Sequence, residues 1–521
     1  MIKKRFNSTG VCVPKKHYMV DISNKLIQIK RLVESEFYFT INRPRQYGKT
    51  TTLNRLKKML NDEYMVVSIS FEGIGDKVFK SEQEFSKTFL ELLSENIELT
   101  DVDEAQRLRD LSIDLNNIKD LSRTITQFVR DSKKEVVLFI DEVDKSSNNQ
   151  LFLSFIGMLR NKYLAREVEE DYTFKSVILV GMYDVKSLKL KLRQEEEAKY
   201  NSPWNIAVDF DIDMSFSTEE ISSMLKEYAD INKVVMDIEA LSKEIYFFTG
   251  GYPYLVSRIC QIIDEKVIVN SNISWSIEHV RQGIKIINEE VNTLFESIVK
   301  NLENNNELYE LVNRILVDGE QIIFNPLDPT ISLGVTYGIF KKGENGVEIG
   351  NIIFEEIIYN YMISKVRTTT NKMSLYNVKS SFVAEDGSLN IVKILQRFQQ
   401  FMKEQYSAKD KEFIEHHGRL LFLAFIKPII NGTGFDFKEV QISEEKRLDL
   451  VITYNSFKYI VEMKIWRGTK YHEEGLKQLY DYLDIHGLSE GYLLIFNFNK
   501  NKEYKENIVR YNDKDIFEVY V

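Results

Sequence analysis

Four short apolar runs alternate with longer amphipathic stretches in the first part of the chain. Their β-branched, aromatic and aliphatic side chains are typical of buried strands, and the stretches between them place apolar side chains at helical spacing. Strands that alternate with helices predict a mostly parallel sheet flanked by helices. The runs are residues 36–41, 64–71, 136–140 and 176–181, and a further candidate strand covers residues 205–210.

The loop after the first run has the composition of a phosphate-binding loop, with Gly48-Lys49-Thr50 at the start of a predicted helix. Backbone N–H groups and the helix dipole attract an anion there. Lys49 is predicted to reach the β- and γ-phosphates of ATP, and the Thr50 hydroxyl to bind Mg²⁺. Arg43 stands where the usual pattern has glycine, so an ordinary helix N-terminus is the competing interpretation. The other predicted nucleotide contacts are Arg45, Gln46, Tyr47, Gly48 and Thr51.

The apolar run at 136–140 ends in two carboxylates, Asp141 and Glu142. Ligands bind at the carboxyl ends of strands in open α/β sheets. Asp141 is therefore predicted to hold Mg²⁺, and Glu142 to orient the water that attacks the γ-phosphate. A solvated strand end is the alternative for this pair alone. The loop and the acidic strand end together, in this order, predict a P-loop ATPase.

A helical lid is predicted after the sheet. Ser217 and Glu220 have the spacing of a capping box at a helix start. Further on, Thr249-Gly250-Gly251-Tyr252 predicts a turn, with Pro253 near the start of the next helix. A plain helix–helix turn is one interpretation, and a lid in which Pro253 touches the nucleotide is the other. Arg258, farther along that helix, is a candidate phosphate sensor, and Arg45, Arg193 and Arg258 are all candidates for an arginine finger.

Residues 283–367 predict a small helical module with a β-hairpin. Its arms are residues 333–340 and 346–349, which flank a polar segment as in the wing of a winged helix. Only two lysines mark this wing, so a packing or partner role is as well supported as DNA binding. A polar linker follows, and the helical pattern that starts at Leu389 begins a new domain.

A second hairpin is predicted near the C-terminus, with residues 446–454 and 457–466 as its arms. Both arms are rich in β-branched and aromatic residues and partly alternate, which is strand behaviour. Asn455-Ser456 is an acceptable two-residue turn. Counting outward from this turn pairs Tyr454 with Phe457 and fixes the register of the two strands.

This register places Asp449 opposite Glu462, with their Cβ atoms about 4.5–5.5 Å apart. Lys464 projects from the same face, because it lies two residues beyond Glu462. Two carboxylates beside a lysine suit metal-assisted hydrolysis with Mg²⁺ or Mn²⁺, in which the lysine stabilises charge or positions water. A solvated, charged sheet face is the alternative. The other face is predicted to make the core through Leu448, Leu450, Ile452, Val461, Met463 and Ile465.

Two predicted helices flank this hairpin in the sequence. Glu415 on the first is a candidate further carboxylate, and Gln478 and Tyr482 share a face of the second at i, i+4 spacing. His416 and His417 are interpreted as packing or surface residues, because hard divalent cations prefer oxygen.

Composition narrows the class of protein. The chain has 521 residues, 43% hydrophobic and 28% charged, which is enough for about three or four globular domains. Cys12 and Cys260 are the only cysteines, so neither a disulfide framework nor a cysteine zinc site is expected. No signal-peptide or membrane-spanning pattern is seen, and a cytoplasmic location is expected. The net charge of −10 argues against a wholly basic nucleic-acid binder but allows a local basic groove.

The first half of the chain resembles the bacterial AAA-ATPase-like proteins. Their phosphate loop likewise lacks the first glycine, which makes Arg43 resemble a family trait. Asp141-Glu142 is similar to their Walker B motif, and Gly251-Tyr252-Pro253 resembles the lid Gly-x-Pro of the related STAND-type ATPases.

The C-terminal part resembles the PD-(D/E)XK nuclease superfamily. Asp449 and Glu462-Met463-Lys464 are similar to its core motif, although Leu448 replaces the usual proline. Gln478 to Tyr482 resembles the Gln-x-x-x-Tyr of the RecB-like branch, and Glu415 is similar in placement to the first-helix acid. The resemblance implies catalytic roles for Lys464, Glu415 and Gln478.

The expected architecture is a multidomain α/β chain. It comprises a P-loop αβα ATPase domain (1–215), a helical lid (216–282), a winged-helix-like module (283–367) and a restriction-endonuclease-like α/β domain with its linker helix (368–521). The expected function is ATP-controlled, metal-dependent cleavage of DNA, in defence or mobile elements. The alternative is an ATP-dependent switch or assembly protein whose nuclease fold only binds nucleic acid or a partner. Homo-oligomerisation is left open.

Overall fold

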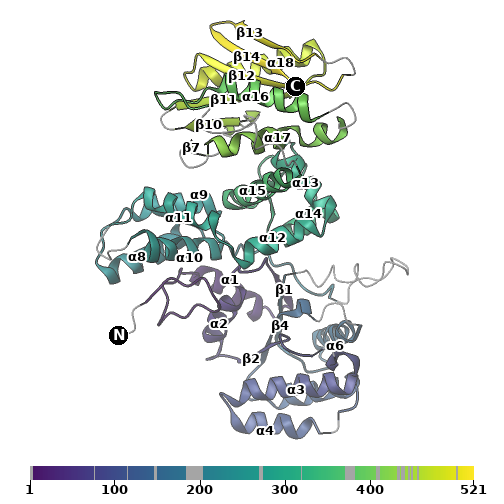
Figure 1. Cartoon of the computed structure of the whole chain (residues 1–521). Coiled ribbons are helices and arrows are strands. Elements are labelled where there is room, and N and C mark those ends of the chain that lie inside the picture. Colours follow the sequence, from purple (N-terminus) through teal and green to yellow (C-terminus); the bar gives the residue numbers. More distant parts are fainter. Residues whose placement is uncertain are drawn as a thin grey trace. The chain divides into compact units, whose positions relative to one another are not determined.

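The computed structural model divides into two compact units (Figure 1). The first comprises Met1–Ser297, Ser332–Phe340 and Gly350–Ile353, and the second comprises Ile298–Ile331, Lys341–Ile349 and Phe354–Val521. The residues described are 4–75, 77–113, 115–145, 150–182, 204–268, 274–317, 320–369, 382–406, 411–430, 434–435, 441–443, 446–447, 450–454, 457–499 and 503–521.

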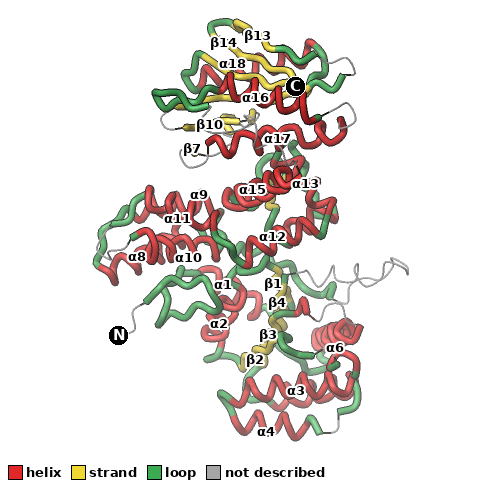
Figure 2. The backbone as a smooth tube through the Cα atoms, in the orientation of Figure 1, coloured by secondary structure: helices red, strands yellow, loops and turns green. Residues whose placement is uncertain are grey.

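A parallel four-stranded sheet organises the first unit. Figure 2 shows its strands one beside the next, in the order β1-β4-β3-β2. All six residues of β3 are buried, as expected for the central apolar run. The four predicted strands are therefore confirmed. Their bounds are β1 Phe39–Asn42, β2 Met65–Ser70, β3 Val136–Asp141 and β4 Ser176–Gly181.

The predicted strand at residues 205–210 is wrong. Only Val208 pairs with the sheet, through a single parallel bridge to Phe39. The buried Trp204 donates its indole N–H to the Thr40 hydroxyl at 3.1 Å, and its carbonyl accepts from the Ala207 N–H in a turn. This anchored turn occupies the residues that would have extended the strand.

Helices cover the sheet and bury a continuous aromatic and aliphatic core. Side chains of Phe85, Phe128 and Phe155 pack in one cluster with Leu138 of β3. Three of the helices begin with a side chain that accepts an N–H from the first turn, from Ser81, Asp101 and Asn117 respectively. The helices are α1 Ser23–Glu34, α2 Lys49–Leu60, α3 Glu82–Glu98, α4 Val102–Leu111, α5 Ile118–Asp131 and α6 Gln150–Glu167.

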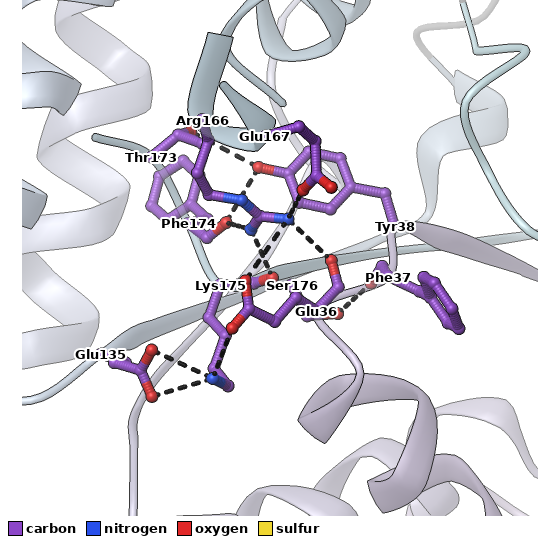
Figure 3. Close-up of polar contacts among 10 residues, drawn as sticks. All are labelled: Glu36, Phe37, Tyr38, Glu135, Arg166, Glu167, Thr173, Phe174, Lys175 and Ser176. Atoms are coloured by element: carbon purple, nitrogen blue, oxygen red, sulfur yellow. Dashed lines mark hydrogen bonds and ion pairs between the residues drawn. The ribbon is translucent and has the colours of Figure 1, made fainter. Parts of the chain in front are cut away.

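One arginine ties the end of α6 to the starts of two strands (Figure 3). Arg166 donates to the carbonyls of Phe174 and Lys175, both at 2.8 Å, and to that of Glu36 at 3.0 Å. Its guanidinium also lies over the ring of Tyr38, 5.7 Å from the centroid. These contacts satisfy backbone carbonyls at the amino ends of β1 and β4. Asp141 lies at the opposite edge of the sheet, at the carboxyl end of β3.

Four helices follow the sheet in the segment predicted to form a lid. Ser217 and Glu220 form the capping box, and α9 ends at Thr249 while α10 starts at Pro253. The segment before α1 packs on these helices through Phe6, whose ring lies 5.2 Å from that of Tyr228. The lid helices are α8 Thr218–Asn232, α9 Ile238–Thr249, α10 Pro253–Ile262 and α11 Ile277–Glu289, with a π-helical turn at Ile263–Val267.

The hairpin predicted at residues 333–340 and 346–349 is only partly right, because its first arm is mostly helical. The Asp328 side chain accepts the N–H groups of Thr330 and Ile331, which starts a helix there. A short hairpin follows, after a turn at Gly338 with φ of 75°. The elements are α12 Thr293–Glu303, α13 Asn306–Leu316, α14 Pro329–Thr336, β5 Phe340–Lys342, β6 Val347–Ile349 and α15 Ile352–Thr369.

The second unit contains a mixed six-stranded sheet in the order β13-β14-β12-β11-β10-β7. β10 and β11 form the predicted antiparallel hairpin, while β12 runs parallel to both β11 and β14. The strands are β7 Gly434–Phe435, β10 Leu450–Tyr454, β11 Phe457–Ile465, β12 Glu490–Phe496, β13 Glu506–Tyr511 and β14 Lys514–Tyr520. A separate small pair is β8 Gln441–Ser443 with β9 Lys446–Arg447.

Leu450, Ile452, Val461 and Met463 of the predicted core face are buried, and the opposite face of the sheet is covered as well. Leu479 packs with Ile495 on one face, whereas the ring of Phe398 lies 6.4 Å from that of Phe496 on the other. Successive strand residues project from opposite faces, so α18 covers one face and α16 the other. The helices of this unit are α16 Ile391–Gln405, α17 Lys411–Ile430 and α18 Thr469–Ile485. Within the described part of the chain, no helix is long and apolar enough to cross a membrane.

Candidate functional sites

The phosphate-loop candidate lies between β1 and α2, as predicted. Gly48 caps α2 with φ of 77°, and Gln46 also has a positive φ of 56°. Lys49 donates to the carbonyls of Arg43 and Pro44 at 2.8 and 2.9 Å. Burial lowers the pKa of Lys49, although nearby carboxylates act in the opposite direction. A lysine whose ammonium group is held by loop carbonyls points toward the space that the loop surrounds.

Thr50, Asp141 and Glu142 meet at the carboxyl end of β3. The Thr50 hydroxyl donates to Asp141 Oδ2 at 2.9 Å, and Asp141 Oδ1 accepts the Glu142 N–H at 2.9 Å. Hydroxyl and carboxylate oxygens are hard donors of the kind that Mg²⁺ prefers, so the residues fit this ion. Burial, and then the charge of Asp141, raise the pKa of Glu142. Glu142 also has φ of 58°, an uncommon backbone conformation for a non-glycine residue.

Arg43 has a structural task that explains the missing glycine. Its guanidinium donates to the carbonyl of Ile212 at 2.8 Å and to that of Phe210 at 3.3 Å. It also lies over the Phe210 ring, 5.2 Å from the centroid. The side chain is therefore engaged with the segment after the sheet rather than with the loop interior.

The lid turn contacts the loop. The Tyr252 hydroxyl donates to the Arg45 carbonyl, and the rings of Tyr252 and Tyr47 lie 4.8 Å apart. A Cβ atom added to Gly48 would lie 3.9 Å from Cβ of Pro253. Pro253 therefore sits beside the predicted phosphate loop, whereas the plain-turn interpretation required no such contact.

The remaining loop residues and the candidate arginines make other contacts. The Gln46 amide donates to the Thr293 hydroxyl at 3.1 Å, and the Thr51 hydroxyl accepts the Cys12 N–H at 3.1 Å. Arg258 pairs with Glu290, the residue that follows α11, at 2.7 Å. Arg193 lies outside the described residues.

The second candidate site lies on the face of the C-terminal sheet that α18 covers. The predicted register is confirmed: Tyr454 pairs with Phe457, and Leu450 pairs with Val461. Glu462 is 1% exposed, and Lys464 Nζ lies 2.8 Å from Glu462 Oε1. A buried carboxylate needs a cationic partner to offset its desolvation, and Lys464 provides one.

Asp449 itself lies outside the described residues, so its pairing with Glu462 stays a prediction. It immediately precedes Leu450, where the described part of β10 begins. Within the described residues, no group of three His, Cys, Asp or Glu side chains could hold a metal ion. Of the two predicted metal ligands, Glu462 is the one that the structure describes, and its carboxylate is a hard oxygen donor.

α18 approaches this site, whereas α17 packs against α16, with the rings of Phe398 and Phe422 5.0 Å apart. Gly475 of α18 packs on Lys464, because a Cβ atom there would lie 3.3 Å from Lys464 Cγ. Gln478, one turn later, is half-buried, and Tyr482 is 1% exposed within the core. Glu415 lies in α17, but its side chain, like those of His416 and His417, is outside the described part.

Comparisons with known proteins agree with the two sites described above. A family model described as an AAA-like domain matches residues 15–348. The chain belongs to this AAA-like family. A second model, the PD-(D/E)XK nuclease superfamily, matches residues 433–510. Both resemblances inferred from the motifs are therefore confirmed, and the AAA-like chain is a multidomain α/β protein of the expected class.

Three solved structures are among those similar to this AAA-like chain. A Walker-type ATPase of Pyrococcus abyssi is 11% identical, with a TM-score of 0.46, covering 68% of this chain and 99% of its own. The ORC2 protein of Aeropyrum pernix is 12% identical, with a TM-score of 0.38 and coverage of 70% and 99%. The RuvB Holliday junction branch migration motor of Thermotoga maritima is 14% identical, with a TM-score of 0.32 and coverage of 63% and 92%. Among curated proteins, none matches.

The structure of this AAA-like chain also places two residues that the motifs did not single out. Glu518 in β14 is 1% exposed and lies 2.5 Å from Nε2 of His472 in α18. A sequence signal existed for Glu518, because it interrupts the apolar run Ile516 to Val521. His472 had no comparable signal, since a single histidine on an amphipathic helix is common.

Proposed function

We propose that this chain is an ATPase whose AAA-like part controls a metal-dependent nuclease in its PD-(D/E)XK part, with DNA as the substrate. The observation that carries the nuclease part is the buried Glu462 beside Lys464 on the face covered by α18. The ATPase part is supported by the contact between Thr50 and Asp141 at the end of β3. These pairs belong to two different motifs on separate sheets.

In the AAA-like part, Lys49 would exchange the carbonyls of Arg43 and Pro44 for the β- and γ-phosphates of ATP. Thr50 and Asp141 would hold Mg²⁺, which supplies positive charge to the phosphates when it is bound. Glu142 would accept a hydrogen bond from the attacking water and so orient it. The lid residue Pro253 would border the phosphates, as its proximity to Gly48 suggests.

In the nuclease-like part, Asp449 and Glu462 would hold Mg²⁺ or Mn²⁺. The cation, when bound, supplies Lewis acidity to the scissile phosphate. Lys464 would donate hydrogen bonds to the attacking water or to a phosphate oxygen, and Glu415 and Gln478 would complete the site. The burial of Glu462, which is 1% exposed, would strengthen its electrostatic interactions with the cation and with Lys464.

The proposed organisation has four parts: ATPase domain 1–215, lid 216–282, winged-helix-like module 283–367 and nuclease-like domain 368–521. The lid contacts the phosphate loop through Tyr252. A change in the bound nucleotide would therefore alter the contacts between the loop and the lid. Such a coupling would let ATP control the nuclease rather than only coexist with it.

The test uses the purified full chain with single-stranded and double-stranded DNA, with and without ATP and Mg²⁺ or Mn²⁺. We expect metal-dependent cleavage whose rate changes with ATP, and Lys49→Ala should remove the ATP dependence while metal-dependent cleavage persists. DNA binding without cleavage under every condition would instead indicate the alternative, a switch or assembly protein with a nuclease fold.

A further inference from the structure

Strand β13 forms one edge of the six-stranded sheet. Among the strands that the structure describes it pairs with β14 alone, and Figure 1 shows it at the outer edge of that sheet. Most of its residues are exposed, and Ile508 near its middle is 77% exposed. The backbone of an edge strand offers N–H and C=O groups that can pair with a strand of another chain. β13 is therefore a candidate interaction surface.

The pairing with β14 determines which backbone groups of β13 point outward. Just before β13, the carbonyl of Lys505 accepts the Tyr520 N–H at 3.0 Å, so the backbone of Lys505 faces β14. In an antiparallel pair, the backbone groups of successive residues point alternately toward the partner strand and away from it. Glu506, Ile508 and Arg510 therefore direct their N–H and C=O groups along the open edge of the sheet.

The side chains of these three outward residues have a self-complementary order. They are spaced by two residues, so they project from the same face of the sheet, with an acid and a base on either side of the exposed Ile508. An antiparallel second copy of β13, centred on Ile508, would place the two isoleucines opposite each other. It would also place Glu506 of each copy opposite Arg510 of the other. Every outward residue would then meet another outward residue, as a hydrogen-bonded pair requires.

We propose that β13 is a dimerisation strand, which pairs antiparallel with β13 of a second copy of this chain in the register centred on Ile508. The two sheets then join into one continuous sheet. Other registers fit less well. Parallel pairing sets Glu506 beside Glu506 of the second copy and Arg510 beside Arg510, and like charges directly opposite each other are destabilising. A shift by two residues places Ile508 opposite a charged side chain. The proposal does not depend on the proposed nuclease function.

The contacts that these charged side chains make within the chain are compatible with pairing across a dimer. Glu506 Oε2 accepts from the Gln396 amide at 2.7 Å, and Arg510 Nη1 lies 2.8 Å from Asp515 Oδ1. A carboxylate has two acceptor oxygens and a guanidinium has five N–H donors, so each side chain can bind a second partner. Glu506 is exposed, and the side chain of Arg510 is 63% exposed. Both are therefore accessible to a second copy.

The competing explanation is that Glu506 and Arg510 protect the edge, because charged side chains on edge strands discourage association with other chains. In that case the chain stays monomeric, and reversing either charge leaves it so. If the two residues pair across a dimer, reversing one charge sets like charges opposite each other at two symmetric places and weakens the dimer. Exchanging both charges restores the opposite pairs, so the double variant separates the two explanations.

The experiment measures the mass of the full chain by sedimentation without nucleotide, at concentrations up to about 100 µM, because small interfaces are weak. We expect the wild type to dimerise. Glu506→Lys and Ile508→Lys should each raise the dissociation constant at least about tenfold, and Glu506→Lys combined with Arg510→Glu should restore the dimer. Glu473→Lys is the matched control, since Glu473 is an exposed acid on α18, and it should dimerise like the wild type.

Residue-resolved hydrogen exchange tests the register. In the dimer, the amides of Glu506, Ile508 and Arg510 should exchange slowly, and in Ile508→Lys they should exchange fast. The amides of Asn507 and Val509 face β14 and should stay protected in both, which shows that the hairpin remains folded. If Ile508→Lys unfolds the hairpin, Glu506→Lys provides the comparison. A monomeric wild type at every concentration, a dimer with fast exchange at Ile508, or a double variant that stays monomeric would overturn the proposal.

Discussion

The nucleotide site takes its shape from the backbone, whereas the nuclease-like site takes its shape from strand register. Gln46 and Gly48 in the loop and Glu142 after β3 have positive φ angles, and Lys49 is held by loop carbonyls. On the C-terminal sheet, Glu462 and Lys464 meet because they are two residues apart on one strand under a helix. The first site therefore depends on local turns, and the second on how strands and α18 pack.

The largest expected effect concerns the nuclease-like site. Lys464→Ala should lower DNA cleavage by at least about 10²-fold, because it removes the cation that stabilises charge at the reacting phosphate. ATP hydrolysis should be unchanged. Lys458→Ala is the matched control, because Lys458 is exposed on the same strand. The measurement compares the cleavage rates of the two variants on one DNA substrate. Equal rates would contradict a catalytic role for Lys464.

The second prediction concerns ATP turnover at the nucleotide site, which Glu142→Gln should reduce. We expect ATP turnover to fall by about 10²-fold while ATP binding persists, since only the water-orienting group changes. Glu135→Gln, at the exposed opposite end of the same apolar run, should hydrolyse ATP normally. Steady-state ATPase rates and nucleotide-binding titrations provide the measurement, and normal turnover in Glu142→Gln would contradict the assignment.

The third prediction concerns the contribution of Arg43 to stability, through its hydrogen bonds to the carbonyls of Phe210 and Ile212. Arg43→Ala leaves the carbonyls of Phe210 and Ile212 without this donor, and should lower the free energy of unfolding by about 2 kcal/mol. Urea unfolding of the AAA-like part measures this change. Arg45→Ala is the control in the same loop, because Arg45 is exposed. A similar loss in both variants would show that Arg43 is no special anchor.

The smallest effect concerns the raised pKa of Glu142. A carboxyl with a raised pKa in the folded state is destabilising when ionised, so its cost is present above that pKa and disappears as the pH falls below the ordinary value of about 4.3. Glu142→Gln should therefore raise Tm slightly at pH 7 to 8, by less than the roughly 2–4 °C that 1 kcal/mol produces in domains of this size. The gain should vanish near pH 4, and a gain that grows on acidification would contradict this account.

Prediction from the sequence succeeded where neighbours in the chain decide the structure. The hairpin register followed from counting outward from one turn, and the phosphate loop followed from its flanking strand and helix. It failed at residues 205–210 and 333–340, where contacts with Trp204 and a helix start at Asp328 determined the conformation. Local β-propensity is weak enough for such contacts to override it.

The sequence by itself determined the two families of motif, the order of the strands along the chain and the side of the hairpin that carries Glu462 and Lys464. These depend on spacing within a few residues, which the periodicity of strands and helices fixes. Only the tertiary structure decided that Arg43 reaches the carbonyl of Ile212, that Pro253 lies beside Gly48, and that His472 meets Glu518. Each of these contacts joins residues far apart in the chain, and their meeting depends on the order in which strands pair and the face on which a helix packs.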